Sequence, residues 1–391
     1  MDNSVYIISA CRTAIGSLIG QFSKIPAVNL GSTVIAEVIK RADIDPNEIS
    51  EVIMGQVLTA GSGQNPARQA ALLAGISNDI PAYTINMVCG SGLKAVYNGF
   101  NLIKSGEVSA VVCGGMENMS LAKHCINLRG GKKLGNLEME DTILVDGLMD
   151  PNVKMHMGKT AEYLAKKYGV SRHEQDTYAL NSHIKARDSI TNGYFEDEIL
   201  AVKDTKGNLI RKDEQVRFDT CEEALSKLKP VFEEDGSVTA GNSSSINDGA
   251  AALLLCNLDT LTIKNLNPLA RIVAFAQSAL DPIEMGLGPI KAVRSLLNKA
   301  NWNLEDVDLF EINEAFAVQS ILVIRELNVD PDKVNVSGGA IALGHPIGCS
   351  GARILVTLLY NLRRLKKGRR IAALCIGGGM GIAIAVEVMT E

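Results

Sequence analysis

The chain has 391 residues, of which 46% are hydrophobic and 21% charged, with 36 glycines and a net charge of −5. This length exceeds one ordinary core, and the glycine-rich composition indicates a soluble α/β protein of two or three packed subdomains. The negative charge, and the lack of a basic run interleaved with aromatic residues, argue against nucleic-acid binding. Apolar runs are too short for a membrane span or a signal peptide, so a cytoplasmic protein is expected.

The first 118 residues alternate helical and strand-like segments. Residues 29–42, 68–73 and 92–105 have helical apolar spacing, whereas residues 52–57, 82–88 and 110–113 are short apolar runs typical of buried strands. Gly114 and Gly115 mark the end of the last run. This alternation predicts a mostly parallel sheet covered by helices on both faces.

The C-terminal part repeats this plan. Residues 42–49 align without gaps on residues 300–307, and Ser91-Gly92 aligns on Ser350-Gly351 at nearly the same offset. Equal offsets in one order indicate an internal duplication. The stretch between the halves is richer in charge, and amphipathic helices are predicted over 160–167 and 173–190.

These features divide the chain into three parts. We expect an N-terminal α/β half over 1–118, which carries the reactive Cys89 described below, and a C-terminal α/β half over 251–391. The inserted loop domain, 119–250, is expected to cover the active site and to supply substrate-binding and oligomer contacts.

Eight cysteines are scattered through the chain, with no C-x-x-C pair and no two histidines at metal spacing. Without an export signal, reduced thiols are expected and a structural zinc site is not. Cys89 stands out because it follows an extended segment and precedes Gly-Ser-Gly at the start of a helix. Free N–H groups and the helix dipole lower a thiol pKa there, in a turn that works like a nucleophile elbow. A buried structural cysteine is the alternative.

His345 lies between Gly344 and Pro346, in a rigid loop instead of a regular element. The duplication aligns it with Asn86, three residues before Cys89, so symmetric packing of the halves would bring it to the same cleft. A histidine beside a cysteine makes a thiolate and general base pair. A loop histidine at the surface is the alternative.

Two more strand ends carry groups suited to a site. Cys375 follows the apolar run 371–374 and precedes glycines, including Gly377, whose backbone N–H groups could form an oxyanion hole. A dinucleotide phosphate loop is the alternative, but no helix and later acid follow it. Asn313 ends the run 309–312 and suits the holding of a water or an amide. It could instead cap a helix that begins at Glu314.

In this order, Cys89, N-E-A-F at 313–316, G-H-P at 344–346 and C-x-G-G-G-x-G at 375–381 resemble the thiolase family over nearly the whole chain. The resemblance implies duplicated βαβαβαββ halves in a layered α-β-α-β-α arrangement with an inserted loop domain. It implies that Cys89 takes an acyl group as a thioester, that His345 activates it, and that Cys375 moves the α-proton of a second acyl-CoA. One oxyanion hole would use His345 and a water held by Asn313; the other would use the N–H groups of Cys89 and Gly377.

The resemblance also implies a substrate. His156 and Met157 stand in an H-M-G string similar to that of short-chain, biosynthetic-type thiolases, where the histidine contacts the thioester region and the methionine narrows the acyl pocket. Ser244 matches a serine of the pantetheine-binding loop, Arg217 a residue near the nucleotide end of CoA, and Phe316 belongs to the N-E-A-F string and is expected to bind substrate. We therefore expect reversible Claisen condensation of two acetyl-CoA to acetoacetyl-CoA and CoA, with no cofactor and no metal. Residues 128–131 lie in a segment similar to the loop that builds tetramers, so a homotetramer is expected.

Three alternatives stay open on the sequence alone. A ketoacyl synthase that accepts acyl-carrier-protein substrates would lack a second catalytic thiol such as Cys375. A lipid-carrying or scaffold protein would be expected to lose the cysteine or the histidine. Redox control through a disulfide between Cys89 and Cys375 is permitted, although nothing in the sequence requires it.

Overall fold

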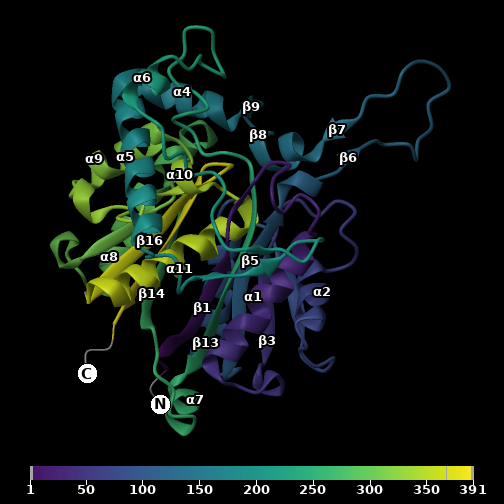
Figure 1. Ribbon diagram of the computed structural model, residues 1–391, viewed down its shortest axis with the longest axis vertical. Helices are drawn as coiled ribbons and strands as arrows, with labels where there is room; N and C mark the ends of the chain where they lie inside the picture. Colours follow the sequence, from purple (N-terminus) through teal and green to yellow (C-terminus); the bar gives the residue numbers. More distant parts are fainter. Residues whose placement is uncertain (1–2, 367, 389–391) are drawn as a thin grey trace.

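Two halves with the same order of elements form the scaffold of this computed structural model, which describes residues 3–366 and 368–388 (Figure 1). The first half contains β1 (Val5–Thr13), α1 (Ala27–Ala42), β3 (Glu51–Gly55), α2 (Pro66–Leu73), β4 (Ala82–Ile85), α3 (Ser91–Lys104), β5 (Ala110–Asn118) and β13 (Asn247–Asn257). The helix α7 (Leu258–Ile263) leads to the second half. That half contains β14 (Ala270–Ala279), α8 (Gly288–Ala300), β15 (Leu309–Ile312), α9 (Ala317–Leu327), α10 (Ala340–Leu343), α11 (Ile347–Leu365), β16 (Arg369–Ile376) and β17 (Met380–Glu387).

The long strands of both halves join in the order β4-β3-β5-β13-β1-β14-β17-β16-β15. The two halves meet where residues 5–7 of β1 pair with residues 270–272 of β14. Counted outward from this junction, β1, β13, β5 and β3 of the first half correspond to β14, β17, β16 and β15 of the second. The order of the strands therefore confirms the duplication that the sequence offsets predict.

The prediction of a mostly parallel sheet is wrong for the centre. The pairs β3–β4, β3–β5 and β15–β16 are parallel, whereas the five pairings between β5 and β16 are antiparallel. Parallel neighbours need a crossover connection, and a tight turn over residues 377–379 joins β16 to β17 instead. β13 spans residue 250, the predicted end of the loop domain, and pairs with β5 and β1 of the first half.

Helices form three layers around the strands. The outer core on the first half includes residues of α1 and α2, the central core lies between α3, α11 and both sets of strands, and the outer core on the second half includes residues of α8 and α9. Along β16, residues 371, 373 and 375 face the outer core while residues 372, 374 and 376 face the central one, as the period of a strand requires. The result is the layered α-β-α-β-α arrangement.

The repeat is also visible in how the helices end. α1 is followed by Asp43 with a φ of 53°, and α8 by Asn301 with a φ of 54°. Asp and Asn are the residues other than glycine that best tolerate this left-handed conformation. Aligned positions of the two halves thus stop their helices by the same device.

β5 runs to Asn118, five residues beyond the end that the glycines predict. Gly114 and Gly115 lie inside the strand, where a Cβ on Gly114 would overlap the backbone of Ala251 and one on Gly115 that of Gly348. These glycines permit close approach and do not mark a turn. The beginning of α11 thereby packs directly on β5.

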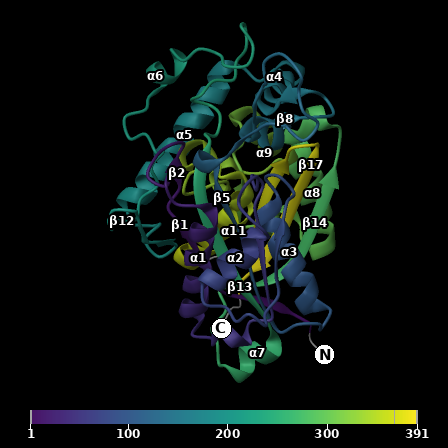
Figure 2. The same ribbon diagram turned by 90° about the vertical axis from the view of Figure 1, so that its right-hand side faces the viewer.

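The inserted segment carries α4 (Met157–Tyr168), α5 (Arg172–Thr191) and α6 (Glu222–Ser226), which gather at the end of the molecule opposite to α7 (Figures 1 and 2). The short strands of this segment are β6 (His124–Cys125), β7 (Glu140–Asp141), β8 (Met149–Asp150), β9 (Met155–His156), β10 (Ile199–Leu200), β11 (Val202–Lys203) and β12 (Leu209–Ile210). One more short strand, β2 (Gly16–Ser17), belongs to the first half. The β6–β7 hairpin projects away from the body (Figure 1). Within residues 3–366 and 368–388, no helix is both long and apolar enough to cross a bilayer.

The two predicted helices of this segment form as α4 and α5, but α5 is not amphipathic in the expected sense. Ser171 begins α5 with a capping box to Glu174. The buried face that follows is largely polar, and includes Gln175, Asp176 and Ser182. These side chains bond to loops of irregular backbone, which an apolar face would leave unsatisfied.

Candidate active site

Cys89 lies in a sharp turn between β4 and α3. Val88 has a φ of 47°, which is a strained value for a β-branched residue. The hydroxyl of Ser91 secures the turn, since it accepts from the backbone N–H of Met87 at 2.8 Å and donates to the carbonyl of Val88 at 2.6 Å. The predicted strand–turn–helix placement of Cys89 is confirmed.

The pKa of Cys89 departs from the sequence expectation. Burial raises it to about 11, while the backbone N–H groups of Gly377 and of Cys89 itself act in the opposite direction. The helix N-terminus therefore does not suffice to form the thiolate, because desolvation disfavours the charge more strongly. At neutral pH the group is a thiol that requires a base.

His345 is buried, with 6% of its surface exposed, so the alternative of a surface histidine is wrong. Its backbone N–H donates to Oδ1 of Asn247 at 2.8 Å, and Gly344 before it has a φ of 108°, which favours glycine. Burial, together with the smaller effect of the nearby Arg353 guanidinium, lowers the pKa of His345 to about 3. The imidazole is neutral at physiological pH and can accept a proton.

Ser350 determines which ring nitrogen of His345 can accept a proton. Its Oγ lies 2.5 Å from Nδ1 of His345 and 2.8 Å from the carbonyl oxygen of Pro346. A carbonyl can only accept, so when the single hydroxyl proton goes to Pro346, Oγ accepts from Nδ1–H. Nε2 is then left with a free lone pair. Ser350 aligns with Ser91 in the duplication, so corresponding serines support Cys89 in one half and His345 in the other.

Cys375 is the penultimate residue of β16, just before the tight glycine turn. It is buried, and desolvation together with the nearby Cys89 raises its pKa. Gly378 and Gly379 have φ values of 87° and 79°, and a Cβ on Gly379 would overlap the carbonyl of Leu280. The turn therefore requires glycine, and it brings the N–H of Gly377 to the sulfur of Cys89.

Asn313 lies at the end of β15 and is fully buried. Its Nδ2 is 3.5 Å from each ring nitrogen of His345, while Oδ1 has no hydrogen-bond partner among the described residues. The helix-cap alternative is wrong, because α9 begins at Ala317 and its N-cap is Phe316. A buried amide oxygen without a protein partner suits a bound water.

One cavity of about 350 Å³ brings most of the predicted residues together. Those that line it are Cys89, His156, Met157, Ser244, Phe316, His345, Cys375 and Gly377. Apolar side chains such as Met119, Leu148 and Met285 form much of the remaining wall. Asn313 and Arg217 do not line the cavity. Asn313 contacts it through His345, and the backbone N–H of Arg217 donates to Nδ1 of His183.

His156 presents a defined donor to this cavity. Its Nδ1 accepts from the backbone N–H of Gly158 at 3.0 Å, and burial lowers its pKa, so the neutral ring carries its proton on Nε2. The ring stacks on Phe232 at 4.8 Å between centroids. Gly158 makes room for this stack, because a Cβ there would overlap the ring of Phe232.

Glu117 supports the site, a role that was not predicted from the sequence. Its buried carboxylate accepts from the backbone N–H groups of Val57, Leu58 and Gly348 at 3.0, 3.2 and 2.9 Å. It thereby joins the first half to the start of α11, two residues after the G-H-P string. Burial raises the pKa of Glu117 to about 7.

Comparison with known proteins places this geometry in a family. A family model described as "Thiolase, N-terminal domain" matches residues 5–259, and "Thiolase, C-terminal domain" matches residues 266–388. The chain is 52% identical to the cytosolic acetyl-CoA acetyltransferase of Rattus norvegicus (99% of this chain, 98% of that protein) and 48% identical to the acetyl-CoA acetyltransferase of Shinella zoogloeoides (99% and 100%). Among solved structures, the acetyl-CoA acetyltransferase of Bacillus anthracis superposes with a TM-score of 0.97 at 43% identity, and human mitochondrial 3-ketoacyl-CoA thiolase with 0.97 at 41%, each over 99% of both chains. The family models and these relatives match the chain over nearly its full length, and its duplicated scaffold brings two thiols and a neutral histidine to one cavity. The chain therefore belongs to the thiolase family.

Proposed function

We propose that this protein catalyses the reversible condensation of two acetyl-CoA to acetoacetyl-CoA and CoA, through an acetyl thioester on Cys89. The observation that carries the proposal is the meeting of Cys89, Cys375 and His345 in one largely apolar cavity. A single nucleophile and base would suffice for hydrolysis or acyl transfer, whereas a second thiol supplies the base for carbon–carbon bond formation. The names of the relatives, acetyl-CoA acetyltransferases at about half identity, support the same reaction.

In the first half-reaction, Nε2 of His345 takes the proton of the Cys89 thiol. The thiolate attacks the thioester carbonyl, and the N–H groups of Cys89 and Gly377 stabilise the charge that develops on oxygen. The bond to CoA sulfur breaks, His345 returns the proton to the departing CoA thiolate, and acetyl-Cys89 remains. The effect of both N–H groups on the pKa of Cys89 supports their place near the reacting sulfur.

In the second half-reaction, Cys375 gives its proton to His345 and then, as a thiolate, removes the α-proton of a second acetyl-CoA. The enolate oxygen is stabilised by Nε2–H of His345 and by a water held on Oδ1 of Asn313. The carbanion attacks the acetyl group of Cys89 and displaces its sulfur. Cys375 then passes the α-proton to the Cys89 thiolate, and His345 returns its extra proton to the Cys375 thiolate. Both thiols and the neutral imidazole are thereby restored.

Acetyl-sized groups are favoured by the cavity walls. The sulfur of Met157 lies where it would touch a Cβ placed on Gly377, beside the proposed oxyanion hole, and Nε2–H of His156 offers a donor to a thioester oxygen. Ser244 and Phe316 line the side along which a pantetheine arm would run, and we propose that Arg217 meets the nucleotide end of CoA. Thiolysis of longer 3-ketoacyl-CoA is the second candidate, because the human mitochondrial 3-ketoacyl-CoA thiolase has the same fold.

Thiolysis of acetoacetyl-CoA by CoA tests the proposal, with turnover and labelling of Cys89 measured together. Cys89→Ala should abolish turnover and label, whereas Cys375→Ala should block condensation yet still accept acetyl on Cys89. Full activity of Cys89→Ala would disprove the reaction. A series of 3-ketoacyl-CoA lengths decides between the two candidates, since the first requires a steep fall beyond four carbons.

We also propose a cytoplasmic homotetramer. The β6–β7 hairpin projects from the body and exposes apolar side chains at residues 128, 134, 137 and 139. Several exposed apolar side chains on one projecting hairpin favour a protein interface there. Light scattering of the full chain measures the mass, and a monomer would contradict the proposal. The name of the rat relative, a cytosolic enzyme, supports the compartment.

A further inference from the structure

The polar face of α5 is hydrogen-bonded to a segment that continues into the wall of the active-site cavity. Residues 239–246, which supply Thr239, Ala240 and Ser244 to the cavity, form little regular structure. They make two isolated bridges, from Thr239 to Pro230 and from Ser243 to Phe316. The position of such a segment depends on its side-chain hydrogen bonds. Those bonds lead to the first two turns of α5.

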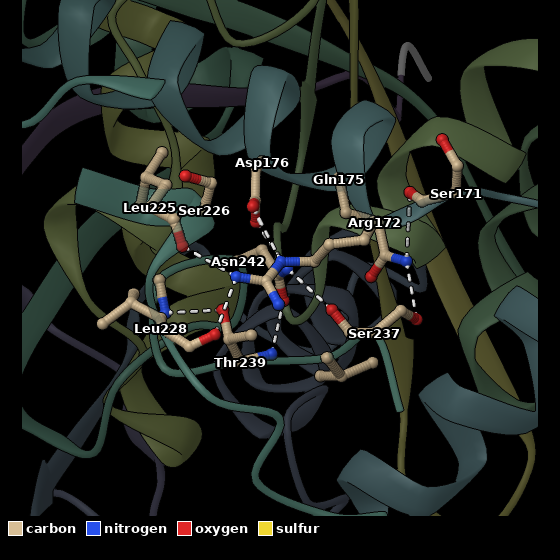
Figure 3. Close-up of polar contacts among 12 residues, drawn as sticks. Ser171, Arg172, Gln175, Asp176, Leu225, Ser226, Leu228, Ser237, Thr239 and Asn242 are labelled. Carbon is tan, nitrogen blue, oxygen red and sulfur yellow. Dashed lines mark hydrogen bonds and ion pairs between the residues drawn. The ribbon is translucent and has the colours of Figure 1, made fainter. Parts of the chain in front are cut away.

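The central contact is an ion pair within α5 (Figure 3). Nε of Arg172 donates to Oδ2 of Asp176 at 2.7 Å, and the other carboxylate oxygen of Asp176 accepts from Nδ2 of Asn242 at 2.9 Å. Nη2 of Arg172 donates to the carbonyls of Leu225 and Leu228 at 2.7 and 2.9 Å. One guanidinium and one carboxylate thus join α5 to the C-terminal end of α6 and to the segment that contains Asn242.

Asn242 transmits this anchorage to the cavity. It is fully buried, its Nδ2 also donates to the carbonyl of Ser237 at 3.0 Å, and its Oδ1 accepts from the backbone N–H of Thr239 at 2.8 Å. Its own carbonyl accepts from the N–H of Ala317 at 2.9 Å, next to the segment that carries Phe316. The stretch that Arg172 bonds through the carbonyls of Leu225 and Leu228 leads within a few residues to Val231 and Phe232 on the cavity wall.

We propose that Asp176 and Arg172 are positioning residues, which set the wall that binds the pantetheine arm and so determine the affinity for CoA thioesters. This rests on the proposed function. Neither residue lines the cavity, so both act through Asn242 and the loop carbonyls. When Asp176 is removed, Nδ2 of Asn242 keeps one acceptor, the carbonyl of Ser237. Arg172 keeps its bonds to the carbonyls of Leu225 and Leu228. The fold therefore keeps its other ties while the wall loses its fixed position.

The test compares Asp176→Ala, Asn242→Ala and the double variant with the unaltered protein in acetoacetyl-CoA thiolysis. Both single variants should raise KM for acetoacetyl-CoA and for CoA by about tenfold and keep kcat within about twofold. The double variant should match Asn242→Ala, because both changes break one connection. Asp188→Ala is the matched control: it removes an exposed ion pair with Arg187 on the same helix and should leave KM unchanged.

A thioester without the pantetheine arm separates positioning from general damage. Acetylation of Cys89 by S-ethyl thioacetate, followed by mass spectrometry, should proceed at the same rate in Asp176→Ala as in the unaltered protein. An equal loss with this reagent, or an unchanged KM for CoA substrates, overturns the proposal. If Asp176→Ala does not fold, Arg172→Lys replaces it; a lysine cannot bridge the carboxylate and two carbonyls, so KM should rise about threefold. No thiolysis by the unaltered protein would refute the proposed function itself, whereas normal thiolysis with unchanged variants refutes only the positioning role.

Discussion

Ser350→Ala removes the acceptor of the proton on Nδ1 of His345 and leaves the rest of the cavity intact. In the protein, Oγ of Ser350 lies 2.5 Å from Nδ1, and the ring is almost completely buried. A buried donor without a partner costs about 1–3 kcal/mol, and each 1.4 kcal/mol is a factor of about ten. The ring therefore moves to the other tautomer or rotates, and the fraction with a free Nε2 lone pair falls by about ten- to a hundredfold.

The rate of acetylation of Cys89 in a single turnover should fall by the same factor, measured by rapid quench with labelled acetyl-CoA. The chain has only five histidines, so the ¹⁵N shifts of the His345 ring can be assigned and should report the loss of the Nδ1–H tautomer. Ser350→Thr keeps the hydroxyl and, if it folds, should restore most of the rate. An unchanged acetylation rate together with unchanged ¹⁵N shifts in Ser350→Ala would refute the reasoning.

Three further outcomes are expected. Burial raises the pKa of Cys89 to about 11, so the thiol is protonated at neutral pH. The rate of its alkylation by iodoacetamide, measured by peptide mass spectrometry, should therefore rise about tenfold per pH unit from pH 7 to 9. A plateau below pH 8 would indicate a preformed thiolate. Met157→Ala widens the cavity beside Gly377 and should raise the ratio of 3-ketohexanoyl-CoA to acetoacetyl-CoA thiolysis at least fivefold, with no change in that ratio counting against Met157 as the limit. Gly115→Ala forces a methyl group into the carbonyl of Gly348 and should lower the free energy of unfolding by about 3 kcal/mol, seen as a lower urea midpoint. A midpoint equal to that of the unaltered protein would contradict the close packing of α11 on β5.

Local sequence was sufficient for features that depend on one short segment. Helices with apolar residues at helical spacing formed where expected, and the repeated Asp43 and Asn301 end corresponding helices because both tolerate a left-handed backbone. The glycines after Cys375 predicted a tight turn for the same reason, and Gly378 and Gly379 have positive φ values. In the turn at Cys89 the left-handed residue is Val88 and not a glycine. The order of motifs along the chain was specific enough to indicate the family.

Features that depend on distant partners could not be read in this way. Gly114 and Gly115 suggested the end of a strand, yet both lie within β5. Ala251 of β13 packs against Gly114, and the start of α11, more than 230 residues later, packs against Gly115. The apolar pattern of a strand reports its burial but not the direction of its neighbour, so the antiparallel centre was missed. Asn313 stood where a cap is common, and only the packing of β15 turned it towards His345.

The sequence by itself predicted Cys89, His345 and Cys375 as the reacting groups, since each lies beside glycines that permit a tight local backbone. The tertiary structure decided their protonation. Desolvation by surrounding apolar side chains keeps Cys89 a thiol and His345 neutral, and Ser350 leaves one nitrogen of the ring free to act as the base. It also decided that a polar helix face should hold the cavity wall, because the loops that α5 supports come from elsewhere in the chain. Solvation and hydrogen-bond partners arise only when segments remote in sequence come together.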